Sequence, residues 1–189
     1  YKNILHFEFI SFCTLFFILG ILDDLKIEVK PKFRLLIMIS FLLFLIIVNG
    51  VYLEKTGFEF LNKLLEIDIF SVIFVSLCFL FIINGSNLID GFNGLLGIHS
   101  IIILIILFFI NLINETNDLI YILFFISVVM LIFIKFNFPK AIMFLGDSGA
   151  YLTGAFIAIS VINTSILNPN ISPMFFCVLL FYLFFEVFF

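Results

Sequence analysis

Seven long apolar segments follow one another along the chain, separated by six short polar connections. A helix that spans a bilayer needs about 20 mostly apolar residues, which is close to the length of these segments. Neither a repeat nor a soluble domain is visible between them. The pattern predicts an all-α, polytopic integral membrane protein, a single domain over 1–189 with about seven transmembrane helices. These run approximately over residues 5–22, 33–52, 67–83, 96–113, 118–135, 150–166 and 172–189.

Composition supports this class and excludes others. Hydrophobic residues make up 65% of the chain, charged residues 12%, and the mean hydropathy of +1.37 is far above that of a soluble domain. The net charge is −4 and there is no basic block, so a nucleic-acid partner has no support. Cys13, Cys78 and Cys177 lie inside apolar segments without a CxxC pair, and we interpret them as buried, inert thiols.

Lysine and arginine are distributed unequally between the two sides of the membrane. By parity, the first, third and fifth connections share one side, and the other three share the opposite side. The opposite side, with the start of the first helix, holds Lys2, Lys55 and Lys63. Because short cytoplasmic loops are enriched in Lys and Arg, the first set is predicted to face the cytoplasm. That set holds six basic residues: Lys26, Lys30, Lys32, Arg34, Lys135 and Lys140.

Two adjacent carboxylates close the first apolar segment in the stretch "LGILDDLKIEVKPKFR", residues 19–34. Adjacent side chains on a helix point about 100° apart. Asp23 and Asp24 therefore cannot clasp one ion symmetrically, and one can face a site while the other orients neighbouring groups. The alternative interpretation is that both only mark the membrane interface.

The stretch "NGSNLIDGFNGLLG", residues 84–97, is polar although it lies between two apolar segments. Asn84, Asn87 and Asp90 recur at intervals of three, which predicts one side of a helical turn. Amide and carboxylate oxygens are hard ligands of the kind Mg²⁺ takes, and glycines such as Gly91 allow close approach. The alternative is that these small and amide residues serve helix packing.

A third polar stretch, "FNFPKAIMFLGDSG", covers residues 136–149 and directly precedes another apolar segment. Asp147 in a glycine-flanked turn at a helix start can hold a metal, and the helix N-terminus suits a phosphate. An ordinary N-cap is the alternative role for this aspartate. Parity places all three stretches on one face. Together they suggest magnesium-assisted chemistry on a phosphorylated substrate.

Three motifs in this order carry a family resemblance: "LGILDDLKxxxxPKxRL", "NxxNLIDGxNGL" and "FNFPKAxxFLGDSGAYLxG". They cover about residues 15–160 and resemble the polyprenyl-phosphate N-acetylhexosamine-1-phosphate transferases, or glycosyltransferase family 4. The resemblance implies transfer of a sugar 1-phosphate from a UDP-N-acetylhexosamine to polyprenyl (undecaprenyl) phosphate, with release of UMP. It also implies a bacterial inner (cytoplasmic) membrane protein that needs Mg²⁺, with Mn²⁺ as an alternative.

Residue roles follow from the matching motif positions. Asp23, Asp24 and Asp90 are expected to be catalytic, with the Asp pair handling the lipid phosphate and the nucleotide. Asn87 and Asp147 are expected to hold the metal. Substrate binding is expected at Lys26, Asn84, Gly91, Lys140 and Gly146.

The chain also departs from the family pattern. Members have about ten or eleven spanning helices and a His-rich cytoplasmic loop, which this chain lacks. It starts at Tyr1 and stops within an apolar segment, so we expect truncation at both ends. Ile89 in place of threonine, and the "FNFP" element, favour the branch that initiates O-antigen or related lipopolysaccharide synthesis over the peptidoglycan branch. A homodimer is one option for the oligomeric state.

Other enzyme classes and transport fit the residues less well. Aromatic prenyltransferases and CDP-alcohol phosphatidyltransferases need aspartates at intervals of four, or a DG followed by AR. Here Phe92 and Asn93 follow Asp90-Gly91. A membrane ion or proton transporter would carry acidic residues at mid-helix, whereas nearly every acid here lies at a helix end. We therefore prefer transfer to transport.

Overall fold

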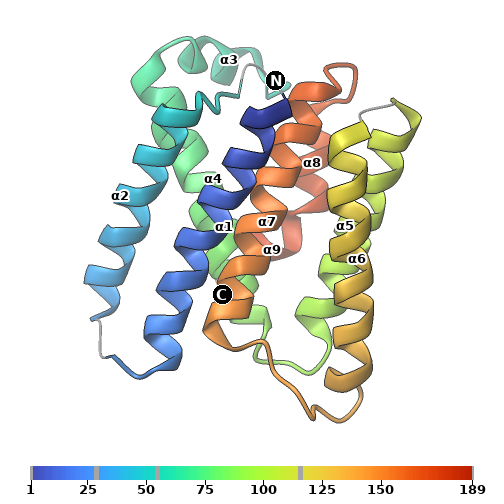
Figure 1. The fold of residues 1–189 in the computed structure, drawn as a ribbon. Coiled ribbons are helices and arrows are strands. Elements are labelled where there is room, and N and C mark those ends of the chain that lie inside the picture. Colours follow the sequence, from blue (N-terminus) through green and yellow to red (C-terminus); the bar gives the residue numbers. More distant parts are fainter. Residues whose placement is uncertain (1, 28–29, 54–55, 115–116, 189) are drawn as a thin grey trace.

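The computed structural model describes residues 2–27, 30–53, 56–114 and 117–188, and the elements in these ranges are all helices. This confirms the all-α class. Figure 1 shows the long helices running alongside one another as a bundle. The helices are α1 (Lys2–Asp24), α2 (Pro31–Asn49), α3 (Glu59–Leu65), α4 (Asp68–Ile89), α5 (Leu95–Ile113), α6 (Asn117–Asn137), α7 (Gly146–Leu167), α8 (Pro173–Leu179) and α9 (Phe181–Glu186).

Within the described residues, five helices are long and apolar enough to cross a membrane: α2, α4, α5, α6 and α7. The chain is therefore a polytopic membrane protein. A sixth helix, α1, has 23 residues and lies along the same bundle. The first six predicted segments thus correspond to α1, α2, α4, α5, α6 and α7.

The seventh predicted segment, 172–189, is wrong as a spanning helix. The chain there forms two helices of 7 and 6 residues, α8 and α9, which meet at Leu180. In the second of them the backbone reaches α4 closely, since a Cβ on Gly85 would lie 2.1 Å from the Leu183 carbonyl oxygen. Hydropathy reports the transfer of side chains into lipid, and it carries no information about whether the helix continues unbroken.

Two helix boundaries differ from the predicted segments in a way that matters for the site. The α4 helix continues to Ile89, and α7 already begins at Gly146. Asn84, Asn87 and Asp147 therefore lie in helical turns rather than in connections, and Asp90 follows α4 directly. Polar side chains at a helix end leave the backbone hydrogen bonds of the helix intact, so the helix extends beyond the apolar segment.

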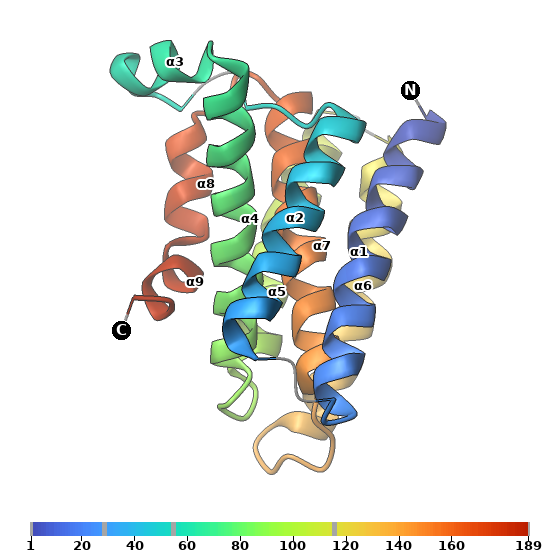
Figure 2. The same ribbon diagram turned by 90° about the vertical axis from the view of Figure 1, so that its left-hand side faces the viewer.

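The α7 helix is the centre of the bundle, and most of its residues from Ala150 to Thr164 are buried. It packs mainly against α1 and α4, on either side of it. Figures 1 and 2 show the α1–α2, α4–α5 and α6–α7 connections at one end of the bundle, with α3 at the other. The prediction that the three polar stretches share one face is confirmed. Which side of the membrane that face meets stays a prediction.

Candidate active site

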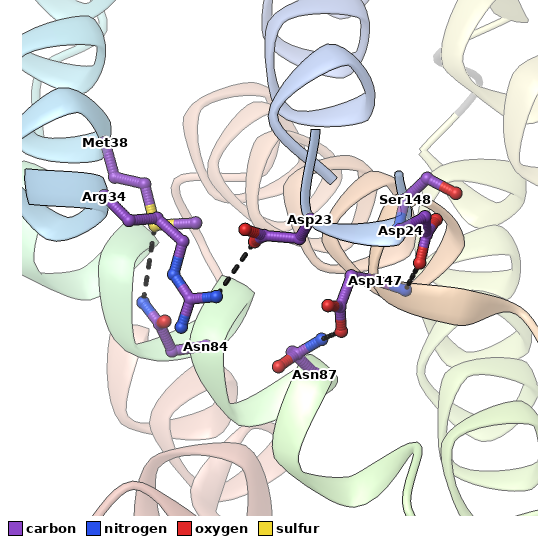
Figure 3. Close-up of polar contacts among 8 residues, drawn as sticks. All are labelled: Asp23, Asp24, Arg34, Met38, Asn84, Asn87, Asp147 and Ser148. Atoms are coloured by element: carbon purple, nitrogen blue, oxygen red, sulfur yellow. Dashed lines mark hydrogen bonds and ion pairs between the residues drawn. The ribbon is translucent and has the colours of Figure 1, made fainter. Parts of the chain in front are cut away.

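Four helix ends meet at this face: the last turn of α1, the first of α2, the last of α4 and the first of α7. Figure 3 shows Asp23, Asp24, Asn87 and Asp147 gathered there. The ends of α1 and α7 contribute acidic side chains, and α2 contributes a basic one. The last turn of α4 contributes the amide Asn87, and the acidic Asp90 follows directly after it. We refer to this region below as the acidic end.

Asn87 and Asp147 form a direct side-chain contact across 60 residues of sequence. The amide Nδ2 of Asn87 donates a hydrogen bond of 2.6 Å to Oδ1 of Asp147. Both side chains are half-buried, so neither is removed from solvent. The pair brings one amide oxygen and one carboxylate next to each other, and both are hard oxygen donors.

Asp23 pairs with the only arginine in the sequence, Arg34 in the first turn of α2. The guanidinium NH1 donates to Oδ2 of Asp23 at 2.9 Å. The same guanidinium carbon lies 5.9 Å from the ring centroid of Tyr151, a cation–π contact. Tyr151 is fully buried in α7, one helical turn after Asp147. Arg34 therefore joins α2 to both α1 and α7.

Asp24 turns toward α7 instead. Its Oδ1 accepts a hydrogen bond from the backbone N–H of Asp147 at 2.9 Å, and its Oδ2 accepts one from Ser148 at 3.1 Å. The two adjacent aspartates therefore have different partners on different helices, as the helical angle between them allows.

Asp90 lies directly after α4 and is half-buried. Burial raises the pKa of its carboxyl to about 6, and the negative charge of Asp147 adds to the shift. A nearby negative charge raises a carboxyl pKa because it disfavours the ionised form, so Asp147 and Asp90 repel each other when both are ionised. A cation would relieve this repulsion.

The remaining predicted site residues lie in different surroundings. Asn84 donates to the Leu80 carbonyl oxygen at 2.8 Å and reaches Met38 Sδ of α2 at 4.0 Å, so its amide faces α2. Lys26 and Lys140 are exposed in the α1–α2 and α6–α7 connections.

The two predicted substrate-binding glycines also differ. Gly91 is exposed, and a Cβ there would meet nothing nearer than the Leu88 carbonyl oxygen at 3.5 Å. Gly146 has φ 68°, and a Cβ there would lie 2.9 Å from Oδ1 of Asp24. Only Gly146 is therefore in close contact with the acidic end.

From the sequence, Arg34 was counted only as a basic charge, and Ser148 and Tyr151 were given no role in the site. A lone arginine eleven residues after Asp23, within the first motif, was the available signal. For Tyr151 the signal was its spacing of four from Asp147, which places both on one face of a helix. Neither spacing identifies a partner without the tertiary structure.

Among the described residues, no group of three or more His, Cys, Asp or Glu side chains could hold a metal ion by itself. Mg²⁺ usually keeps several waters and takes only one or two protein ligands together with substrate phosphates. The Asn87 and Asp147 oxygens fit that pattern.

Comparison with known proteins adds names to this geometry. The family described as Glycosyl transferase family 4 matches residues 6–165. The phospho-N-acetylmuramoyl-pentapeptide-transferase of Dictyoglomus turgidum is 30% identical over 154 residues, which cover 79% of this chain and 50% of the relative. The protein of the same name from Listeria monocytogenes serovar 1/2a is 32% identical over 159 residues, 79% of this chain and 49% of the relative.

A third relative carries a different name. The "Probable undecaprenyl-phosphate N-acetylglucosaminyl 1-phosphate transferase" of Bacillus subtilis is 28% identical over 142 residues, 75% of this chain and 39% of the relative. The chain spans about half the length, or less, of these curated relatives. No solved structure matches it. Since the matched residues include all three acidic motifs and nearly all of the helices that assemble them, the chain belongs to glycosyl transferase family 4.

Proposed function

We propose that the full-length protein transfers an N-acetylated sugar 1-phosphate from a UDP-linked sugar to polyprenyl phosphate. An oxygen of the lipid phosphate attacks the phosphorus that carries the sugar, and the bond to UMP breaks. The products are a lipid-linked diphosphate sugar and UMP. The observation that carries the proposal is the contact of Asn87 with Asp147, flanked by Asp23 and Asp24.

Charge explains why such a site suits this reaction. A phosphate that attacks a diphosphate brings several negative charges together, and they must be neutralised before in-line transfer. Mg²⁺ supplies that neutralisation when bound, and Asn87 and Asp147 would hold it. The exposed Lys26 and Lys140 offer further positive charge near the same end.

Each acidic residue then has a role in the proposal. Asp23, oriented by Arg34, would face the phosphate of the lipid acceptor, next to the pair Asn87 and Asp147 that would hold the metal. Asp90 lies within electrostatic reach of Asp147 and adds to the negative potential that attracts the cation. The basic connections favour a cytoplasmic position for this end, where a soluble nucleotide and a lipid phosphate can meet.

Two donor classes remain candidates. The "FNFP" element favours a UDP-N-acetylhexosamine that initiates a surface polysaccharide, in line with the name of the Bacillus relative. The names of the Dictyoglomus and Listeria relatives favour UDP-MurNAc-pentapeptide as the second candidate. Ile89 is buried and so contacts the bundle rather than a donor sugar, which leaves the decision to an assay.

The test uses membranes that hold the full-length protein, undecaprenyl phosphate, Mg²⁺ and radiolabelled UDP-GlcNAc, with UDP-GalNAc and UDP-MurNAc-pentapeptide in parallel. A lipid-linked product is expected with one donor, and Asp147→Asn should abolish it without loss of folded protein. Asp68→Asn is the matched control, because Asp68 is exposed at the other end of α4. If none of the donors gives a lipid-linked product, the transferase proposal is wrong.

A further inference from the structure

The α7 helix begins without a cap of its own. The first N–H groups of a helix have no partner inside the helix and need acceptors from elsewhere. The preceding residue is Leu145, whose side chain has no acceptor, and no side-chain cap bond forms from that position. The start of α7 therefore depends on another part of the chain.

Asp24 supplies the missing acceptors from the end of α1. Its two carboxylate oxygens each take one backbone N–H, from Asp147 and from Ser148, 123 and 124 residues away. A carboxylate at a helix N-terminus also interacts favourably with the helix dipole. Asp24 thus does for α7 what an N-cap residue ordinarily does within one helix.

The backbones of α1 and α7 come close together around this contact. A Cβ on Gly20 of α1 would lie 2.2 Å from the Ser148 Cα, and one on Gly146 would lie 2.9 Å from Asp24 Oδ1. The two glycines therefore let α1 and α7 approach closely at the level of the acidic end. Asp23, one residue earlier, bonds to Arg34 of α2 (Figure 3).

We propose that Asp24 is a positioning residue that caps α7 from α1 and thereby fixes Asp147 opposite Asn87, whereas Asp23 handles the substrate. The division of roles follows from the geometry: Asp24 has both oxygens bonded to the backbone of α7, and Asp23 has one bonded to a side chain. The functional half of this statement rests on the proposed transferase activity. The structural half does not.

Amide hydrogen exchange of the full-length protein in detergent, without added metal, tests the structural half. In Asp24→Ala, the peptide covering the first turn of α7 should exchange roughly fivefold faster or more, as expected for loss of an N-cap. Asp24→Asn keeps one acceptor oxygen and should give an intermediate rate. Asp23→Asn is the matched control and should leave this peptide unchanged. Equal rates in Asp24→Ala and wild type, or an equal acceleration in Asp23→Asn, would overturn the proposal.

The Mg²⁺ dependence of transfer tests the functional half. If Asp24 positions Asp147, Asp24→Ala should raise the Mg²⁺ concentration for half-maximal rate about tenfold, the size of effect seen when outer-shell partners of metal ligands are lost. High Mg²⁺ should then restore much of the rate. A lower kcat at unchanged Mg²⁺ dependence would instead place Asp24 in the chemistry. Failure of the wild type to transfer any sugar would reject the proposed function, while the exchange experiment would still decide whether Asp24 caps α7.

Discussion

Asn87 near the end of α4 and Asn111 near the end of α5 are both amides in apolar helices, but they lie at opposite ends of the bundle. Asn111 is fully buried, and its Nδ2 donates to the Leu107 carbonyl oxygen and to Thr164 Oγ1, both at 2.8 Å. Its Oδ1 accepts from Asn168 at 3.4 Å. These groups are neutral and bond to one another.

The surroundings of Asn87 are charged. Its partner is a carboxylate, and Asp90 nearby has its pKa raised to about 6 by burial and by Asp147. Neutral amides and hydroxyls can satisfy one another between helices, as around Asn111. Carboxylates of like charge cannot, and a cation would relieve their repulsion. An amide in a membrane helix therefore indicates packing or chemistry according to the charge of its partners.

The largest expected effect is on the transfer rate, and it distinguishes the end of the bundle that holds Asn87 from the end that holds Asn111. Asn87→Ala should lower the transfer rate at least about 100-fold, because it removes an oxygen proposed to hold the metal at the reacting phosphates. The midpoint of thermal unfolding should change little, since the side chain is half-buried and makes one contact across helices. The measurement is the initial rate of lipid-linked product formation. A rate within about threefold of wild type would show that Asn87 has no direct role in the reaction.

The next effect concerns stability at the acidic end. Gly85→Ala would place a Cβ 2.1 Å from the backbone oxygen of Leu183, so α9 must shift away from α4. Overpacking of this kind typically costs about 1–3 kcal/mol. Thermal unfolding in detergent should show a lower midpoint for Gly85→Ala. The matched variant Gly91→Ala, at an open position, should unfold as the wild type does. Equal midpoints for the two variants would mean that α9 does not pack against Gly85.

At the opposite end, Asn111→Ala should affect stability and spare activity. Interhelical hydrogen bonds of polar side chains in membranes contribute on the order of 1 kcal/mol, so a modest drop in the unfolding midpoint is expected. The transfer rate per folded molecule should stay at the wild-type level. A loss of rate as large as that of Asn87→Ala would show that the two ends are not separate in function.

The smallest effect is a pH dependence. The raised pKa means that Asp90 loses its proton as pH rises through about 6. If the ionised carboxylate of Asp90 attracts Mg²⁺, the transfer rate at limiting Mg²⁺ should rise about fourfold between roughly pH 5.5 and 7.5. The same shift favours the protonated folded state, so this group lowers stability as pH rises from 3.8 towards 6.

Rates measured across this range with Asp90→Asn provide the control. The remaining activity of this variant should vary less with pH than that of the wild type. The stability loss in Asn111→Ala should be the same at both ends of the range, because the side chains of Thr164 and Asn168 and the Leu107 carbonyl, to which Asn111 bonds, do not titrate. A wild-type rate that is flat with pH would argue against a role for the Asp90 carboxylate.

Much of the fold could be predicted because a bilayer permits few backbone arrangements. Each spanning segment must satisfy its backbone hydrogen bonds internally, so long apolar segments become helices, and their parity assigns connections to one end or the other. Hydropathy and parity therefore predicted α1, α2, α4, α5, α6 and α7, and they predicted that the three polar stretches lie at one end of the bundle. It failed at α8 and α9, where the apolar composition continues but the helix does not.

The candidate site could be predicted as a set of residue types but not as a set of contacts. Acidic and amide residues at helix ends identified Asp23, Asp24, Asn87, Asp90 and Asp147 as its members. Their partners could not be predicted, since Asp24 meets α7 after 123 residues and Asn87 meets Asp147 after 60. Separations of this length carry no local signal, because the approach of two helices depends on how small residues such as Gly20 and Gly154 let their backbones pack.

The sequence by itself determined that this is a helical membrane protein with its acidic motifs on one face, because hydropathy, helix length and parity act locally along the chain. Only the tertiary structure decided what each side chain at that face does. It turned Asp23 toward Arg34 and Asp24 toward the start of α7, and it set Asn87 against Asp147. The direction in which adjacent carboxylates point depends on the helices that pack around them, and that packing is a property of the whole bundle.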